Sequence, residues 1–217
     1  GRLHGAAQVA ELNLLSHFAC ADERGSETTE LQLEQFLDLL DLDFAQRSLA
    51  NSAAILTIPA AHMDWLRPGI MLYGATPFAD LGAVELGLRP AMSLTAQLIA
   101  CRDVEVGEAV GYGCTWRAER PSRIGTVSCG YADGYPRHAP AGTPVVVRGL
   151  RVTLVGRVSM DMLMIDLTDV PDAAVGDAVE LWGAQLPVDE VAQAAGTIGY
   201  ELLSKVTARV PRRYRNS

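Results

Sequence analysis

Gly87-Leu88-Arg89-Pro90 is the stretch at which the sequence pattern of this 217-residue chain changes. Before it, short apolar runs alternate with helix-like segments, which is typical of parallel β/α units. After it, segments rich in β-forming residues are separated by turn sequences. We therefore expect two domains, residues 1–88 and 89–217, the first of α/β class and the second mostly β.

The N-terminal part predicts only a few β/α units. Residues 29–32 fit a helix capping box, and one apolar face follows at helical spacing, Leu33, Phe36, Leu37 and Leu40. We expect strands at residues 12–18 and 49–52, a helix at 53–58 and a third strand ending at 71–73. Three strands alone would leave a parallel sheet with open edges. We therefore expect this chain to be part of a longer protein.

The C-terminal part predicts strands at residues 93–101, 124–129, 143–147, 152–155, 162–167 and 178–182, with one helix near 188–195. This series indicates a β-sandwich or an irregular barrel.

Composition narrows the class of protein. The net charge of −8 argues against a nucleic-acid partner. No apolar run approaches the roughly 18 residues of a membrane helix, and no signal peptide is visible. The cysteines, Cys20, Cys101, Cys114 and Cys129, have no metal-type spacing, so we expect no metal site, reduced thiols and a cytoplasmic location.

One tyrosine stands between two glycines, Gly111-Tyr112-Gly113. Glycines on both sides allow a sharp turn and leave the phenol uncovered. A phenol in such a position can serve as an acid or base if a neighbour lowers its pKa from about 10. The alternative is an ordinary turn tyrosine at an interface.

Seven further motifs accompany Tyr112 in a fixed order. They are Ser16–Asp22 (SHFACAD), Asn51–Ala54 (NSAA), Arg67–Gly74 (RPGIMLYG), Gly130–Arg137 (GYADGYPR), Gly156–Met162 (GRVSMDM), Ile198–Glu201 (IGYE) and Arg209–Arg213 (RVPRR). From about residue 12 to 214, the chain resembles the second half and C-terminal domain of bacterial alanine racemases. That family binds pyridoxal 5'-phosphate (PLP) on a (β/α)8 TIM barrel followed by a mostly β domain. The resemblance implies the C-terminal part of such a barrel plus the β domain.

The resemblance implies roles for individual residues. Tyr112 would be a catalytic base, Arg67 would donate to the PLP ring nitrogen, and His17 would lie between them. The phosphate would be bound by Ser52, Gly69, Ile70 and Tyr200. The substrate carboxylate would meet the backbone N–H of Met160, with Tyr131 beside it. The entry corridor would be narrowed by Tyr131, Asp22, Arg137, Arg157 and Ile198.

Each of these residues has an ordinary structural alternative. Arg67 could be a surface arginine, His17 a core histidine and Ser52 a plain helix N-cap. Met160 reads as a core strand residue on pattern alone. Surface ion pairs would equally explain Arg137 and Arg157.

The lysine content sets a limit on the activity of this chain. Lys205 is the only lysine, and it falls in an alternating segment, residues 202–207, that predicts a strand. PLP enzymes hold their cofactor on a lysine amine, which in the resembled family lies on the first barrel strand. A further arginine of the family, upstream of His17, also has no counterpart here. We expect the isolated chain to be inactive.

The implied reaction is PLP-dependent interconversion of L- and D-alanine by two-base proton transfer, which supplies D-alanine for peptidoglycan. The resemblance also implies a homodimer with shared sites, in which Tyr112 and Met160 of one chain face His17, Ser52, Arg67 and Tyr200 of the other. Two alternatives remain open: a racemase of broader amino-acid specificity, and a non-catalytic dimerisation or binding module.

Overall fold

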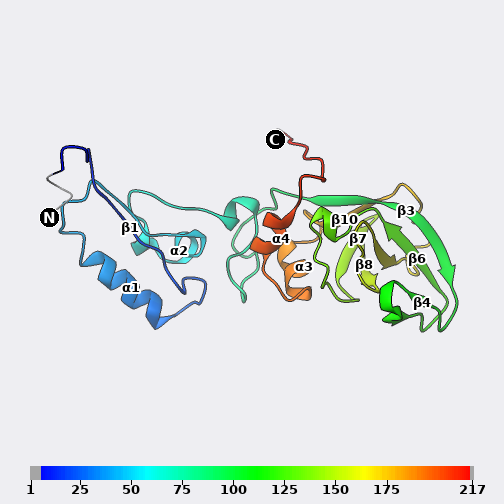
Figure 1. The fold of residues 1–217 in the computed structure, drawn as a ribbon. Coiled ribbons are helices and arrows are strands. Elements are labelled where there is room, and N and C mark those ends of the chain that lie inside the picture. Colours follow the sequence, from blue (N-terminus) through cyan, green and yellow to red (C-terminus); the bar gives the residue numbers. More distant parts are fainter. Residues whose placement is uncertain (1–5, 216–217) are drawn as a thin grey trace. The chain divides into compact units, whose positions relative to one another are not determined.

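The computed structural model describes residues 6–215 and divides the chain into two compact units, Gly1–Arg89 and Pro90–Ser217. Figure 1 shows helices beside a small sheet in the first unit and a strand-rich second unit. Within the described residues, no helix is long and apolar enough to cross a membrane.

The N-terminal unit is built on a short parallel sheet. Strand β1 (Asn13–Leu15) pairs in parallel with β2 (Gln46–Ser48), in the register Asn13 to Gln46. A single parallel bridge joins Ser48 to Trp65. The predicted strand ending at 71–73 is therefore wrong. That segment forms a 3-10 turn, η2 (Ile70–Tyr73), which Gly74 ends in a left-handed conformation at φ 76°.

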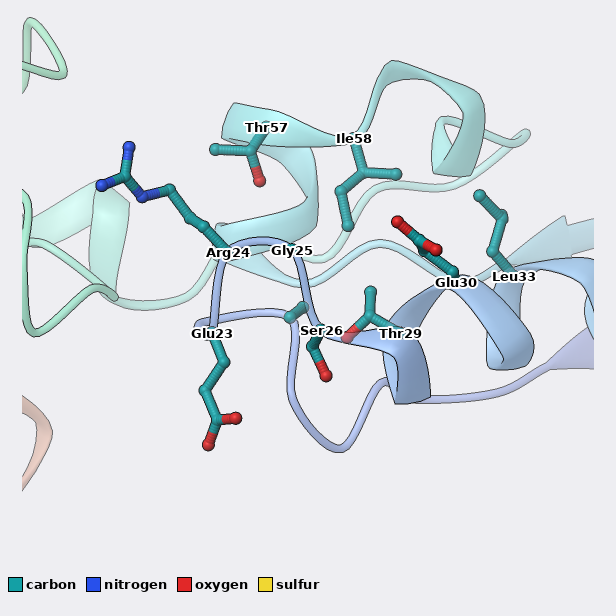
Figure 2. Close-up of a pocket in the computed structure, with 10 residues that line it drawn as sticks. Glu23, Arg24, Gly25, Ser26, Thr29, Glu30, Leu33, Thr57 and Ile58 are labelled. Carbon is teal, nitrogen blue, oxygen red and sulfur yellow. The ribbon is translucent and has the colours of Figure 1, made fainter.

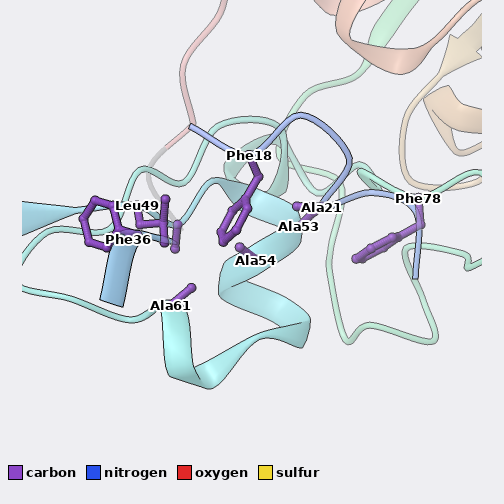
Figure 3. Packing of buried hydrophobic residues seen from close by; sticks show 9 residues of the cluster. Phe18, Ala21, Phe36, Leu49, Ala53, Ala54, Ala61 and Phe78 are labelled. Carbon is purple, nitrogen blue, oxygen red and sulfur yellow. The ribbon is translucent and has the colours of Figure 1, made fainter. Parts of the chain in front are cut away.

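Two α-helices pack beside this sheet. Helix α1 (Glu27–Leu37) begins after Ser26, so the predicted capping box at 29–32 is wrong. The Gln32 side chain instead accepts a hydrogen bond from the Ala19 N–H, at 2.9 Å. Helix α2 (Ser52–Thr57) is followed by a 3-10 turn, η1 (Pro59–Ala61). Figure 3 shows the core between these elements, formed by Phe18, Ala21, Phe36, Leu49, Ala50, Ala53, Ala54, Ala61 and Phe78.

The C-terminal unit contains a closed six-stranded barrel rather than a sandwich. Its strands follow the order β10-β3-β6-β9-β8-β7, and every neighbouring pair is antiparallel. The bounds are β3 (Leu94–Val104), β6 (Ser122–Val127), β7 (Pro144–Val147), β8 (Leu150–Val155), β9 (Leu163–Asp166) and β10 (Ala178–Trp182). Closure pairs the edges that an open sheet would expose.

Shorter elements of this unit carry most of the candidate residues. A separate hairpin of β4 (Ala109–Val110) and β5 (Trp116–Arg117) encloses the turn η3 (Tyr112–Cys114). A second turn, η4 (Tyr131–Asp133), follows β6. The helices are α3 (Val188–Ala194) and α4 (Gly199–Lys205). The strand predicted around Lys205 is therefore wrong, because residues 199–205 are helical.

Candidate active site

Arg67 is held by hydrogen bonds to both strands of the N-terminal sheet region. Its backbone N–H donates to the Ala50 carbonyl at 3.0 Å. Its guanidinium donates from Nη2 to the carbonyls of Ser16, at 2.6 Å, and Leu49, at 3.2 Å, and from Nη1 to the Ser48 hydroxyl. These residues lie at or just after the C-terminal ends of β1 and β2. Arg67 is therefore a fixed, partly buried cation and not a mobile surface arginine.

His17 lies next to this guanidinium. Its Nδ1 is 3.3 Å from Nη2 of Arg67, and its ring is exposed. A guanidinium donates and never accepts, so Nδ1 can only be the acceptor of this contact. Because His17 is exposed, the core-histidine alternative does not describe it.

Ser52 uses its hydroxyl to bind a neighbouring loop. Its buried Oγ accepts the backbone N–H of Gly69 at 2.8 Å and, more weakly, that of Met71 at 3.5 Å. The N-cap of α2 is Asn51, whose Oδ1 accepts from the Ala54 N–H at 3.0 Å. The plain N-cap alternative for Ser52 is therefore wrong. Ser52, Gly69 and Ile70 come together where α2 and η2 begin.

A cavity of about 330 Å³ opens elsewhere in this unit, at the start of α1 (Figure 2). Glu23, Arg24, Glu30 and Thr29 are among the residues that line it, and none of the lining residues is a candidate site residue. Thr29 Oγ1 is buried and has no partner within the described part of the chain. Asp22 lies beside this region, exposed in the loop that precedes α1. The charged residues at the cavity are two carboxylates and Arg24, which already pairs with Asp80, so they offer no defined ligand chemistry.

Tyr112 projects from the tip of the β4–β5 hairpin. Its side chain is 72% exposed, and the flanking Gly111 and Gly113 have φ of 80° and 76°. An added Cβ on Gly156 would lie 2.7 Å from the Val110 carbonyl, and one on Gly113 would lie 3.3 Å from Nη1 of Arg157. The backbone around residue 156 and the Arg157 side chain therefore pack directly against the hairpin that carries Tyr112.

Tyr131, Arg137 and Met160 form a second group in the C-terminal unit. The Arg137 guanidinium carbon lies 6.0 Å from the centre of the Tyr131 ring, a cation–π arrangement. The Tyr131 N–H donates to the Ser159 carbonyl at 3.0 Å, and the Ala132 N–H donates to the Met160 carbonyl at 2.9 Å. Met160 is exposed and lies outside the barrel strands, so it is not the core strand residue that its pattern suggests.

Ile198 and Tyr200 lie at the beginning of α4, and both side chains are exposed. Tyr200 thus belongs to the C-terminal unit, whereas His17, Ser52 and Arg67 lie in the N-terminal unit. Helix α4 also contains Lys205, which pairs with Glu201 one turn earlier. The hydrogen bond from Lys205 lowers the pKa of Glu201. The only lysine therefore occupies a surface ion pair.

Several residues that hold the candidate side chains were not predicted from the sequence. Ser48 orients Arg67, while Asp133 and Asp161 are bridged by Arg209. Arg209 opens one of the recognised motifs, which was the only sequence signal for it. Burial raises the pKa of Cys129 to about 12, which leaves this thiol protonated and inert.

Comparisons with known proteins find one matching family model in each unit. Residues 1–77 match the alanine racemase N-terminal domain and residues 91–214 the alanine racemase C-terminal domain. The chain is 77% identical over 213 residues to a biosynthetic alanine racemase of Pseudomonas aeruginosa, covering 98% of this chain and 60% of that protein. It is 53% identical over 216 residues to an alanine racemase of Vibrio cholerae, covering 98% of this chain and 59% of that protein.

Solved structures give the same result. The biosynthetic alanine racemase of Pseudomonas aeruginosa superposes with a TM-score of 0.96 at 76% identity, covering 99% of this chain and 60% of that one. The Bartonella henselae enzyme, solved with covalently bound pyridoxal phosphate, gives a TM-score of 0.84 at 33% identity, covering 94% and 56%. This chain spans about 60% of the length of its first curated relatives. Its fold is part of a TIM barrel followed by a β-rich domain, and the chain belongs to the alanine racemase family.

Proposed function

We propose that this chain contributes most of the active site of a PLP-dependent alanine racemase. The observation that carries the proposal is the fixed Arg67 guanidinium, 3.3 Å from the His17 ring and held by carbonyls that follow β1 and β2. Strand ends are where TIM-barrel enzymes place their working groups. The parent reaction would interconvert L- and D-alanine and supply D-alanine for peptidoglycan.

The donors in the N-terminal unit fit PLP. Within the described residues, Nε–H and one Nη1–H of Arg67 have no acceptor, so the guanidinium can donate to a ring nitrogen. The Ser52 hydroxyl accepts the Gly69 N–H and keeps its own hydrogen, so it could donate to a phosphate next to the backbone at Gly69 and Ile70. The cofactor, when bound, would supply the electron sink for loss of the Cα proton. Its covalent lysine would have to come from outside this chain, since Lys205 is paired on α4.

The residues of this chain would divide the remaining work. Arg67 stays protonated, so it would donate to the ring nitrogen without giving that nitrogen a proton, which disfavours transamination. His17 would lie between Arg67 and Tyr112, so that the positive charge of the guanidinium acts on the Tyr112 phenol. Tyr112 would remove the Cα proton of L-alanine on one face, and the second base, the lysine from outside this chain, would supply a proton on the opposite face. In the reverse direction Tyr112 would supply the proton on the L-face. The backbone N–H of Met160 would bind the substrate carboxylate.

Access and assembly would complete the site. Tyr131, Arg137, Arg157, Asp22 and Ile198 would narrow the entry to favour alanine, and Tyr200 would add a hydroxyl at the phosphate. We propose a homodimer in which Tyr112 of one subunit serves the Arg67 site of the other, because Tyr112 is 72% exposed at a hairpin tip and could reach a neighbouring subunit. The four cysteines are free thiols, which supports a cytoplasmic location.

The test of Tyr112 uses the full-length enzyme. Tyr112→Phe keeps the ring and deletes the acid/base oxygen, so turnover should fall by about 10²–10⁴-fold while PLP stays bound. Tyr214→Phe, at an exposed tail tyrosine, is the matched control and should keep full turnover. Near-normal racemisation by Tyr112→Phe would contradict the proposal.

Assembly is tested by complementation. Subunits with Tyr112→Phe are mixed with subunits that lack the PLP lysine, and mixed dimers are verified by mass. If sites are shared, one site of each mixed dimer is intact and activity returns from two inactive parents. Mixed dimers without activity would place Tyr112 in its own subunit's site. The isolated 217-residue chain with added PLP should form no D-alanine.

Substrate range separates alanine racemase from a broader racemase. Turnover of serine and lysine should be far below that of alanine if the corridor residues around Tyr131 and Arg137 restrict entry. Comparable turnover of these larger amino acids would favour the broader enzyme.

A further inference from the structure

We infer that Arg209 is a positioning residue for the substrate-carboxylate contact, an inference that rests on the proposed role of Met160. Arg209 connects two loops: the Tyr131 loop, residues 130–133, and the Met160 loop, residues 159–161. Neither motif analysis nor the proposed mechanism gives this arginine a task.

The two loops first meet through their backbones. The Tyr131 N–H donates to the Ser159 carbonyl at 3.0 Å, and the Ala132 N–H donates to the Met160 carbonyl at 2.9 Å. The contact is so close that a Cβ on Gly130 would lie 2.3 Å from the Met160 carbonyl oxygen. Only glycine allows this approach.

This contact fixes the direction of the Met160 N–H. A trans peptide directs its C=O and its N–H to opposite sides. The Ser159 carbonyl and the Met160 N–H belong to one peptide, and Tyr131 binds the carbonyl. The Met160 N–H therefore points away from the Tyr131 loop, and any change in the spacing of the loops rotates it.

Arg209 ties the outer ends of the same loops together. Its Nη2 donates to Asp161 Oδ1 at 2.7 Å, and its Nε lies 3.5 Å from Asp133 Oδ1. The other oxygen of Asp133 accepts the Gly130 N–H at 2.9 Å. Two edges of one planar guanidinium thus reach one carboxylate on each loop, a geometry that a lysine ammonium does not reproduce.

The segment before Arg209 reinforces this bridge. The Thr207 N–H donates to the Asp133 carbonyl at 3.1 Å, and the Thr207 hydroxyl donates to the Ala132 carbonyl at 2.9 Å. Arg209 therefore projects from a backbone that is itself attached to the Tyr131 loop. Its guanidinium adds a side-chain link to the Met160 loop, beside the two backbone hydrogen bonds between the loops.

The exposure of the three side chains indicates that the ion pairs of Arg209 position the loops and add little to the stability of the fold. Arg209 and Asp161 are 52% and 53% exposed, while Asp133 is 15% exposed. Exposed ion pairs contribute little to the free energy of folding. Loss of Arg209 should therefore leave the fold stable and release the Met160 loop.

The experiment compares Arg209→Ala, Arg209→Lys and Arg120→Ala in the full-length PLP-bound enzyme. Arg209→Ala should raise KM for alanine about three- to tenfold, with kcat changed less than about twofold. Arg209→Lys should recover only part of this loss. Arg120 pairs with Asp169 at 2.6 Å on the same unit and touches neither loop, so Arg120→Ala should leave KM unchanged.

Two further measurements keep the inference falsifiable. Hydrogen exchange in the peptide containing residues 157–163 should quicken in Arg209→Ala and not in Arg120→Ala. Asp161→Ala should raise KM like Arg209→Ala, and the double variant should be no worse than either. An unchanged KM, or a fall in kcat that merely follows a lower melting temperature, would overturn the positioning role. Tyr112→Phe is assayed in parallel, and its retained turnover would refute the proposed function and not the role of Arg209.

Discussion

The two units differ in how completely they bury their own apolar residues. Among the described residues, the largest fully buried side chains include Leu49 in the N-terminal unit, and the other eleven lie in the C-terminal unit. Both units also expose large apolar side chains, for example Leu15 at 66% in the N-terminal unit and Val175 at 63% in the C-terminal unit. A closed antiparallel barrel completes its own hydrogen bonding, whereas a two-stranded parallel sheet depends on neighbours. His17, Ser52 and Arg67 thus lie in the unit with the less complete core, and Tyr112 and Met160 lie in the unit with the closed barrel.

Expressing the two units separately should show the largest difference between them. Residues 90–217 expressed alone should unfold cooperatively, because they contain the whole closed barrel and its core. Residues 1–89 alone should lack a cooperative transition, since few apolar side chains are fully buried there. Thermal melts followed by circular dichroism, with the 217-residue chain as reference, measure both. A sharp transition in residues 1–89 would contradict the comparison.

Single Leu→Ala substitutions should show the same difference in burial between the two units, with smaller effects on stability. Leu163→Ala, at a side chain only 1% exposed in β9, should cost about 2–5 kcal/mol of unfolding free energy. Leu15→Ala removes the same atoms from an exposed position in β1 and should change stability by less than about 0.5 kcal/mol. Urea denaturation of both variants tests this. Equal losses would mean that exposure does not distinguish the units.

The next test concerns a backbone contact inside the C-terminal unit. Gly156 and Gly107 both have left-handed φ, of 66° and 84°. Alanine at either position should cost about 1–2 kcal/mol for this conformation. Gly156→Ala should cost more, because its Cβ would meet the Val110 carbonyl, whereas a Cβ added at Gly107 would meet nothing within 4 Å. It should also quicken hydrogen exchange in residues 110–116, which Gly107→Ala should not do.

The smallest expected effect concerns the residues that cap the two helices of the N-terminal unit. Asn51 caps α2 through its side chain, so Asn51→Ala should cost about 1 kcal/mol. Ser26 precedes α1 without a side-chain capping bond, so Ser26→Ala should cost close to nothing. Denaturation curves of the two variants, each compared with the unaltered chain, are sufficient. A larger loss from Ser26→Ala would reverse this assignment of caps.

Sequence patterns predicted the C-terminal strands well because each strand is bounded by turns. The segment 178–182 coincides with β10, and the predicted helix at 188–195 differs from α3 by one residue. Apolar periodicity gave a wrong prediction where an element is too short to show several repeats of its period. Helix α4 has seven residues, and its Leu202-Leu203-Ser204-Lys205 portion fits a strand equally well until the Glu201–Lys205 pair is seen.

The candidate site was predictable only in part, for a related reason. Motifs pointed to residues with distinctive local settings, such as Tyr112 between glycines, and their roles remain predictions. The groups that orient them come from distant parts of the chain. Ser48 lies 19 residues from Arg67, and Asp161 lies 48 residues from Arg209. No local pattern encodes such distances, so the fold has to be known first.

The glycines of the C-terminal unit divide into two kinds that a saturation library would distinguish. At Gly130 and Gly134, an added carbon would lie within 2.4 Å of another residue's carbonyl oxygen, so selection for activity should return glycine codons alone. At Gly107, Gly142 and Gly176, nothing lies within 4 Å and only a positive φ is demanded. Asparagine and aspartate tolerate that conformation, so these three positions should be free to drift toward them.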